Sequence, residues 1–344
     1  MSIIGDDNAG EKIRAFCKTH RIDDDAIFPR DKSSTWRSII LVHGCENTKT
    51  GPAKTSRGQR VFLDMKSEWD VSRYSPTGYR QMKAMLGKKN KELKAVYVDK
   101  WLTDPAKTAR DPRASRGFLS SARGLKILED LAKRKDVDIV YESGSQGSRN
   151  LAVEKLLAPI VNVFTAAFPC FLNILKRGHM VREQDAKSCD EHRMLLKYKF
   201  ASKQGANVLK PNGWVPVPLK WGPLADYLRK KALHRWFIVT LHESGALALD
   251  LSNSGKYQMR WFPGHAVAQS SVRNTTGAGD TFRGALLFGL IQPHTGGEIN
   301  HLGHCVDFAV RCATERCRHY KMGDALTDFG KNGFDLWRKV KGSD

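Results

Sequence analysis

Residues 274–287 read Asn-Thr-Thr-Gly-Ala-Gly-Asp-Thr-Phe-Arg-Gly-Ala-Leu-Leu, and this is the most informative stretch of the sequence. The small residues at 277–279 let the backbone turn sharply and bring its N–H groups close to a ligand. Apolar residues then recur at helical spacing and predict a helix over 281–290: Phe282, Ala285, Leu286, Gly289 and Leu290. The turn therefore lies at a helix N-terminus, where free N–H groups and the helix dipole favour an anion.

Asp280 stands at the start of that predicted helix. A carboxylate there can act as a general base when a substrate hydroxyl lies within hydrogen-bond reach. The stretch is not a P-loop, because no Gly-Lys-Ser/Thr follows, and Gly284 comes too far after Gly279 for a dinucleotide fingerprint. The alternative is a plain Gly-rich strand-to-helix turn in which Asp280 caps the helix.

The full string 274–287 resembles the signature of the PfkB/ribokinase family of sugar and nucleoside kinases. The resemblance implies that Gly277, Ala278 and Gly279 form the anion hole for the transferred phosphoryl group, and that Asp280 takes the proton from the acceptor hydroxyl. It also implies ATP as the donor, Mg²⁺ as the accompanying cation, and a small sugar or nucleoside as the acceptor. Phosphoryl transfer needs positioning, charge neutralisation and a base, and little else from a protein.

Other segments support the resemblance. Residues 5–10 resemble the family's G-x-D-x-x-G segment before a helix, here 11–19, and residues of about 34–64 resemble its small β-sheet lid. Residues 240–246 resemble the T-x-G-x-x-G-A nucleotide segment, and 303–323 resemble the helix and loop that flank the adenine. The resemblance thus implies a homodimer through the lid and a nucleotide site that includes Thr240, Gly245, Thr276, Ala309 and Cys312.

The remaining sequence alternates short β-rich apolar runs with helical stretches, such as the helix expected over 120–133. The expected strands are 38–42, 59–63, 95–98, 137–141, 160–164, 236–241, and a hairpin of 246–251 with 257–262. This alternation favours an α/β layer structure. We expect one ribokinase-like domain over 1–344, with a doubly wound, mostly parallel sheet flanked by helices and a small β-sheet lid. A polar, proline-rich insertion at about 177–232 fits this pattern worst.

Several positions depart from the family pattern. The family's first strand, a substrate-contacting aspartate and a Gly-Gly loop would precede residue 5, so we expect a shortened N-terminus. The N-x-x-E segment that helps to organise Mg²⁺ in many members reads Thr165-Ala166-Ala167-Phe168, although ketohexokinases also depart from it. His242 replaces a glycine beside the phosphates, and an ordinary loop side chain is its simplest interpretation.

The chain is strongly basic, since 57 Lys and Arg against 36 Asp and Glu give a net charge of +21. Both a cationic surface and attraction of polyanions fit this excess. The basic clusters at 88–94, 133–135 and 229–231 carry no stacking aromatics and no helix-turn-helix pattern. Charge alone therefore favours neither an enzyme nor a nucleic-acid-binding protein.

The seven cysteines include no Cys-x-x-Cys pair, which favours a reduced protein of the cytoplasm over a disulfide scaffold. The uncharged stretch 156–175 holds two prolines, so a buried strand explains it better than a membrane span. No metal site is expected, because the following residues lack ligand spacing: His301, His304, Cys305, Cys312, Cys317 and His319. The polar loop 142–149 after a strand could line the cleft or lie on the surface.

Two functions fit these observations. The first is an ATP-dependent phosphotransferase that acts on a hydroxyl of a sugar or nucleoside, with Asp280 as the base. The alternative is a catalytically inactive relative that serves as a binding or scaffold protein and could associate with nucleic acid. The shortened N-terminus, the altered positions 165–168 and 242, and the basic charge motivate the alternative.

Overall fold

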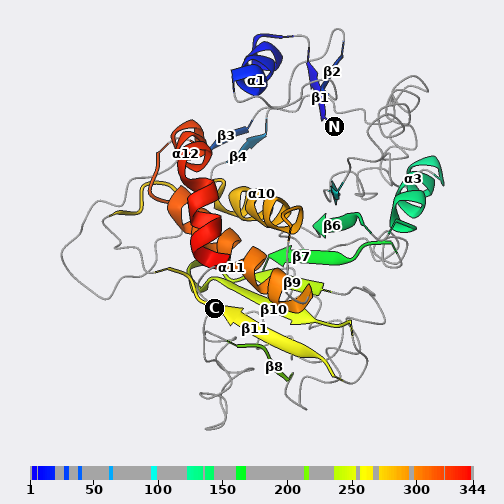
Figure 1. The fold of residues 1–344 in the computed structure, drawn as a ribbon. Helices are drawn as coiled ribbons and strands as arrows, with labels where there is room; N and C mark the ends of the chain where they lie inside the picture. Colours follow the sequence, from blue (N-terminus) through cyan, green and yellow to red (C-terminus); the bar gives the residue numbers. More distant parts are fainter. Residues whose placement is uncertain are drawn as a thin grey trace, which may run out of the picture. The chain divides into compact units, whose positions relative to one another are not determined.

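The computed structural model of the chain describes residues 2–5, 7–19, 27–30, 38–40, 62–64, 94–98, 122–134, 136–142, 160–167, 213–216, 236–252, 256–265, 271–293, 298–320 and 322–341. The chain divides into two compact units, Met1–Lys91 and Glu92–Asp344. In the described residues, each unit has at least one sheet and one helix of its own (Figure 1). The single domain expected over the whole chain stays a prediction.

The N-terminal unit contains two small sheets and one helix. Strand β1 (Ser2–Gly5) pairs in parallel with β2 (Ile27–Arg30), and β3 (Ser38–Ile40) pairs antiparallel with β4 (Phe62–Asp64). The strand pair expected between 38–42 and 59–63 is thus present, and its role as a lid stays a prediction.

Helix α1 (Asn8–Thr19) confirms the helix expected over 11–19, but it begins three residues earlier, within the G-x-D-x-x-G segment. Asp7 starts it, because the Asp7 carboxylate accepts the Gly10 N–H (2.9 Å) and the Asp7 carbonyl accepts the Glu11 N–H (3.0 Å). The aspartate of that segment therefore caps the helix.

The C-terminal unit is built on a seven-stranded sheet in the order β5-β6-β7-β9-β10-β11-β8. The parallel strands are β5 (Ala95–Val98), β6 (Asp138–Glu142), β7 (Val163–Ala167) and β9 (Trp236–Thr240). The sheet continues antiparallel through β10 (Ala246–Asp250), β11 (Gln258–Phe262) and β8 (Val215–Pro216). This arrangement confirms the expected α/β structure with a mostly parallel sheet, and the predicted hairpin.

Strand β7 begins at Val163, three residues later than the strand expected over 160–164. Asn162, just before it, ties the chain to β6 with its side chain as well as its backbone. Its Oδ1 accepts the Ile139 N–H, and its Nδ2 donates to Asp138 Oδ1 at 2.6 Å. The uncharged stretch 156–175 therefore includes a sheet strand at 163–167, and no helix in the described ranges could cross a membrane.

Three helices pack together on one face of this sheet: α10 (Ala278–Leu290), α11 (Glu298–Arg316) and α12 (Met322–Lys341). Helix α3 (Ala122–Ala132) precedes β6 and confirms the helix expected over 120–133. Alternation along each strand directs every second residue to the α10 face. The shared core includes Val140, Val163, Ile238, Ala248, Phe282, Leu286, Val306 and Trp337.

Helix α10 begins at Ala278, three residues earlier than the helix expected over 281–290. Gly277 is its N-cap and adopts the left-handed conformation, with φ of +83°. Because the small residues after it are helical, Asp280 is the third residue of the helix. The turn and the helix thus overlap more than the sequence predicted.

The structure also bears on the expected insertion and on the cysteine and histidine side chains. The insertion expected over 177–232 lies outside the described residues except at 213–216. Within the described ranges, no group of three His, Cys, Asp or Glu side chains could hold a metal ion. The described cysteines are free thiols, and Cys305 and Cys312 are buried in α11.

Candidate active site

The N-terminus of α10 presents backbone donors that helical bonding does not use. The Ala278 N–H donates to the Thr275 carbonyl (3.2 Å), and the Thr276 N–H donates to Asn274 Oδ1 (2.9 Å). The N–H groups of Gly277 and Gly279 have no partner among the described residues. Two of the three amides predicted to form an anion hole are therefore available to a ligand.

Asp280 lies beside these amides, and its side chain is 76% exposed. Its Oδ1 accepts a hydrogen bond from Arg283 Nη1 at 2.7 Å, one helical turn further on. The other oxygen has no partner in the part of the chain that the structure describes. The predicted base is thus held at one oxygen and open at the other.

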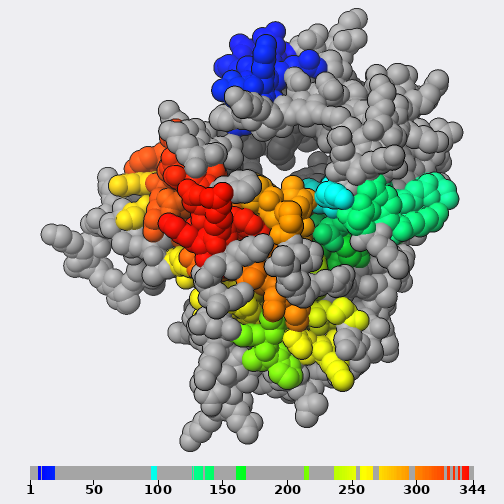
Figure 2. Space-filling view, in the orientation of Figure 1, coloured from blue at the N-terminus to red at the C-terminus, as the bar shows by residue number. Residues whose placement is uncertain are grey.

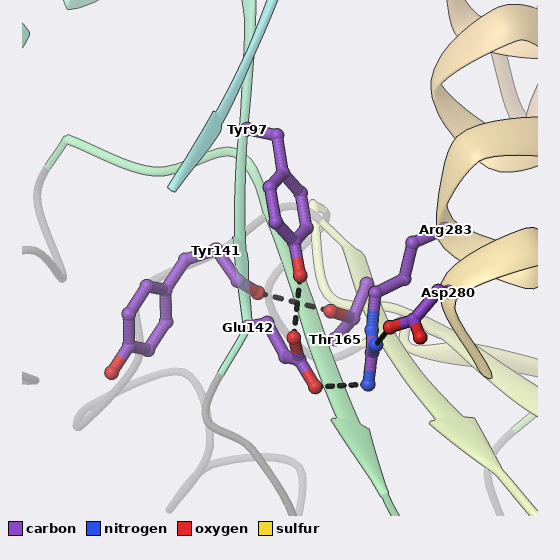
Figure 3. A network of polar contacts seen from close by, with 6 residues as sticks. All are labelled: Tyr97, Tyr141, Glu142, Thr165, Asp280 and Arg283. Carbon is purple, nitrogen blue, oxygen red and sulfur yellow. Dashed lines mark hydrogen bonds and ion pairs between the residues drawn. The ribbon is translucent and has the colours of Figure 1, made fainter. Parts of the chain in front are cut away.

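Arg283 links Asp280 to the sheet (Figure 3). Its Nη2 forms an ion pair with Glu142 Oε1, and Tyr97 donates its hydroxyl to Glu142 Oε2. The Arg283 side chain is 23% exposed and that of Glu142 is 6% exposed, so this part of the network is shielded from water. Four side chains from β5, β6 and α10 therefore form one continuous polar network.

The sequence alone did not indicate that Tyr97, Glu142 and Arg283 form a group. It indicated Glu142 only as the first residue of a polar loop, whereas Glu142 is the last residue of β6. The available signal was alternation, because Val140 lies in the core against α10 and Glu142 follows two residues later on the same face. Figure 2 shows atoms of α10 (golden orange) beside those of β5 (cyan), consistent with the packing of these elements.

The altered segment 165–168 is described as far as Ala167. Thr165 lies opposite Glu142 in the β6–β7 register, and its hydroxyl donates to the Tyr141 carbonyl at 3.2 Å. Thr165 is buried, with 3% exposure, and its hydroxyl is already bonded within the sheet. The carboxylate nearest this position in the register is Glu142 of the neighbouring strand.

The predicted nucleotide residues Thr240 and Gly245 flank the turn between β9 and β10. Gly245 has φ of +89°, and a Cβ there would lie 2.0 Å from the Phe262 carbonyl oxygen, so this position requires glycine. His242 has φ of +53°, a left-handed conformation that also favours glycine. The turn follows the carboxyl end of β9, as Glu142 ends β6, and ligands of parallel α/β sheets bind at such ends.

Ala309 and Cys312 lie in the core instead of on an open surface. Their exposures are 0% and 3%, and burial raises the pKa of the Cys312 thiol to about 12. A nucleotide could contact either side chain only if this packing opened. Their part in a nucleotide site stays a prediction.

The segment after α11 meets the loop that leads to α10. The N–H groups of Arg273 and Asn274 both donate to the Cys317 carbonyl (2.8 and 3.2 Å), and Asn274 Nδ2 donates to the Tyr320 carbonyl (3.0 Å). The Arg273 guanidinium lies over the Tyr320 ring, 5.6 Å from its centroid. The parts of 274–287 and 303–323 that the sequence assigned to phosphate and adenine are thus neighbours.

The chain matches one protein family by sequence. Residues 223–328 match the model of the pfkB family of carbohydrate kinases. No curated protein matches the chain significantly. The matched residues include β9, β10, β11, α10 and α11, and therefore the whole loop 274–280.

Solved structures resemble the chain over nearly its full length. Ribokinase from Giardia lamblia has a TM-score of 0.59 at 15% identity, and the alignment covers 97% of this chain and 82% of that one. Aminoimidazole riboside kinase from Salmonella enterica, complexed with aminoimidazole riboside and an ATP analogue, has a TM-score of 0.50 at 15% identity, with 99% and 84% covered.

Ribokinase from Thermotoga maritima has a TM-score of 0.51 at 13% identity, with 96% of this chain and 80% of that one covered. Identities this low establish the fold alone. The family match adds sequence support over 223–328. Together they confirm the resemblance to the PfkB/ribokinase family.

Proposed function

We propose that this chain, with its pfkB-family match and ribokinase-like fold, transfers the γ-phosphate of ATP to a hydroxyl of a sugar or nucleoside. One observation carries the proposal: the N–H groups of Gly277 and Gly279, which have no partner among the described residues, lie beside an exposed carboxylate, Asp280, at the start of α10. An anion and a hydroxyl bound next to each other there would meet the requirements of phosphoryl transfer.

Each part of the loop has a separate task in this proposal. The Gly277 and Gly279 amides, with the dipole of the thirteen-residue helix α10, bind the γ-phosphoryl oxygens. Asp280 accepts the proton of the acceptor hydroxyl through its open oxygen as that hydroxyl attacks the γ-phosphorus. The bond between the γ-phosphorus and the bridging oxygen breaks, and ADP leaves with the electron pair.

Among the described residues, the site fits an Mg²⁺ ion that binds mainly through the phosphates of the nucleotide. Mg²⁺ on nucleotides commonly takes one or two carboxylates and completes its coordination with phosphate oxygens and water. Both oxygens of Glu142 are engaged, by Arg283 and Tyr97, and Asp280 is assigned as the base, so phosphate oxygens and water would supply the coordination of Mg²⁺. When bound, Mg²⁺ would neutralise phosphate charge.

The test is a panel of sugars and nucleosides with MgATP, in which ADP release by the full chain is measured. We expect at least one acceptor to stimulate ADP release. Asp280→Asn should lower turnover about 10²–10⁴-fold, while calorimetry shows that MgATP affinity changes by less than about twofold. If Asp280→Asn loses turnover but still binds MgATP, the role of Asp280 is catalytic.

Asp335→Asn is the matched control. Asp335 is 64% exposed and pairs with Arg338 three residues later, as Asp280 pairs with Arg283, but it lies on α12. Its substitution should leave turnover unchanged. An Asp280→Asn protein as fast as the parent would contradict the proposal. Salt-sensitive binding of nucleic acid without nucleotide affinity would favour the scaffold alternative.

A further inference from the structure

We propose that Arg283 is a ligand of the γ-phosphate of ATP, held in position by Glu142 and Tyr97. This inference rests on the proposed function and adds a side-chain cation to a site otherwise built from backbone amides. The residues come from three elements, α10, β6 and β5 (Figure 3). The following observations support it.

Arg283 is anchored from the sheet side. The Glu142 side chain is buried, with 6% exposure, and its two oxygens are taken by Arg283 and by the Tyr97 hydroxyl. A buried carboxylate needs a paired cation, because leaving it unpaired is costly. The pair with Glu142 therefore fixes the guanidinium at the carboxyl end of β6.

The contact on the other side is weaker. Asp280 is 76% exposed, and an exposed ion pair contributes little because water screens it. A guanidinium carries five N–H donors, of which Glu142 and Asp280 take one each. In the described ranges no partner accepts the remaining donors, so Arg283 can keep Glu142 and still bind another anion.

The guanidinium lies against the predicted anion hole. A Cβ on Gly279 would lie 3.7 Å from Nη2, 3.8 Å from Nη1 and 3.9 Å from Cζ of Arg283. The guanidinium and the Gly279 N–H, which is not bonded to any residue of the described ranges, are thus within reach of the same anion. Arginine suits this task because its planar donors match phosphate oxygens in pairs.

The charges of the site also favour a side-chain cation at this position. A γ-phosphate on the Gly277 and Gly279 amides would lie close to the Asp280 carboxylate, and two anions at this separation repel each other. Arg283 already contacts Asp280 and can bridge both groups. The guanidinium would then hold the base and the phosphoryl group side by side.

The test compares two nucleotides by calorimetry on the full chain. ADP lacks the γ-phosphate, so removal of a side chain that binds this phosphate should weaken the binding of ATP and not that of ADP. We expect Arg283→Met to weaken MgATP binding about tenfold or more, and to change the affinity for MgADP less than about twofold. Arg338→Met is the matched control, because it removes an Arg–Asp pair of the same spacing on α12, and should alter neither affinity.

Arg283→Met leaves Glu142 without its cation and could unfold the protein. The double variant Arg283→Met with Glu142→Gln removes both charges, and should show the same selective loss of MgATP affinity. Glu142→Gln alone should give a smaller selective loss, because the guanidinium remains without its charged anchor. Thermal unfolding of each variant reports whether it is folded.

The outcomes separate the two proposals. A folded Arg283→Met protein could bind both nucleotides equally more weakly, or bind both as tightly as the parent. Either result would overturn the γ-phosphate contact and leave the kinase proposal intact. A parent protein that binds neither MgATP nor MgADP would overturn both proposals.

Discussion

At the level of single residues, burial makes the Cys305 and Cys312 thiols of α11 unreactive. Cys305 and Cys312 have exposures of 0% and 3%, and burial raises the pKa of each thiol. The thiolate is the nucleophilic form, and a raised pKa keeps these thiols protonated at neutral pH. Both residues therefore act as core packing residues in the described structure.

This gives a labelling prediction. With iodoacetamide at pH 7.5, Cys305 and Cys312 should react at least about tenfold more slowly in the native chain than in the denatured chain. Peptide mass spectrometry measures each site separately. Rapid native labelling of Cys312 would show that its surroundings open, which a direct nucleotide contact by Cys312 also requires.

The residues of the site were partly predictable. Asp280 and the glycines around it form a local pattern, so sequence alone placed them together on one turn. Glu142 and Tyr97 lie far from Arg283 in sequence, and only the order of strands β5 and β6 beside α10 brings them together. No local pattern contains that order.

At the scale of elements, α10 combines an open face with a closely packed one. Gly284 and Gly289 are both inside this helix, but they differ in their surroundings. A Cβ on Gly284 would meet nothing within 4 Å, whereas a Cβ on Gly289 would lie 2.9 Å from Cys305 Sγ and 3.1 Å from Cys305 Cα. Gly289 therefore sets how closely α10 approaches α11.

We expect opposite effects on stability from the same substitution at these two positions. Gly284→Ala should raise the free energy of unfolding by about 0.5–1 kcal/mol, because alanine favours the helix. Gly289→Ala should lower it by about 1–3 kcal/mol, because the added methyl group overpacks the α10–α11 contact. Urea denaturation measures both, and a Gly289→Ala protein as stable as Gly284→Ala would contradict the packing.

Elements were more predictable than their ends. Two short β-rich apolar runs predicted the hairpin of β10 and β11, and helical spacing predicted α10. The start of α10 was wrong by three residues, because the small residues at 278 and 279 have no apolar periodicity yet continue the helix. The start of β7 was also wrong, because apolar content does not show where the Asn162 side chain bonds to β6.

At the scale of the whole molecule, net charge does not by itself produce a binding surface. Two described residues of the basic cluster 133–135 are paired: Lys133 with Asp130 (3.0 Å) and Arg134 with Asp136 (2.9 Å). The bond from Arg134 holds the pKa of the Asp136 carboxyl well below its usual range. These cations are exposed or half-buried and already have carboxylate partners.

We therefore expect specific stabilisation by nucleotide instead of general attraction of polyanions. MgATP at one hundred times its dissociation constant should raise the free energy of unfolding by about 2.7 kcal/mol. Denaturation of the full chain with MgATP, and with magnesium tripolyphosphate as the control, measures this. Equal stabilisation by both ligands that disappears on raising the salt concentration would indicate binding by charge alone.

For the whole molecule, the fold class was predictable from the sequence, but the order of the strands in the sheet was not. Alternating strands and helices predicted a mostly parallel sheet, which the structure has. The strand order, with the antiparallel β10, β11 and β8 beside β9, depends on pairings between distant segments. β8, at 215–216, pairs with β11 at 258–259, and no feature of the sequence between them predicts that contact.

Hydrogen–deuterium exchange tests whether the amides at the start of α10 bind the phosphate of ATP. The Gly277, Gly279 and Asp280 amides have no partner among the described residues, so they should exchange rapidly in the free chain. Saturating MgATP should slow exchange in a peptide spanning 274–282 by about tenfold or more. Unchanged exchange in that peptide, with MgATP binding verified by calorimetry, would contradict the account.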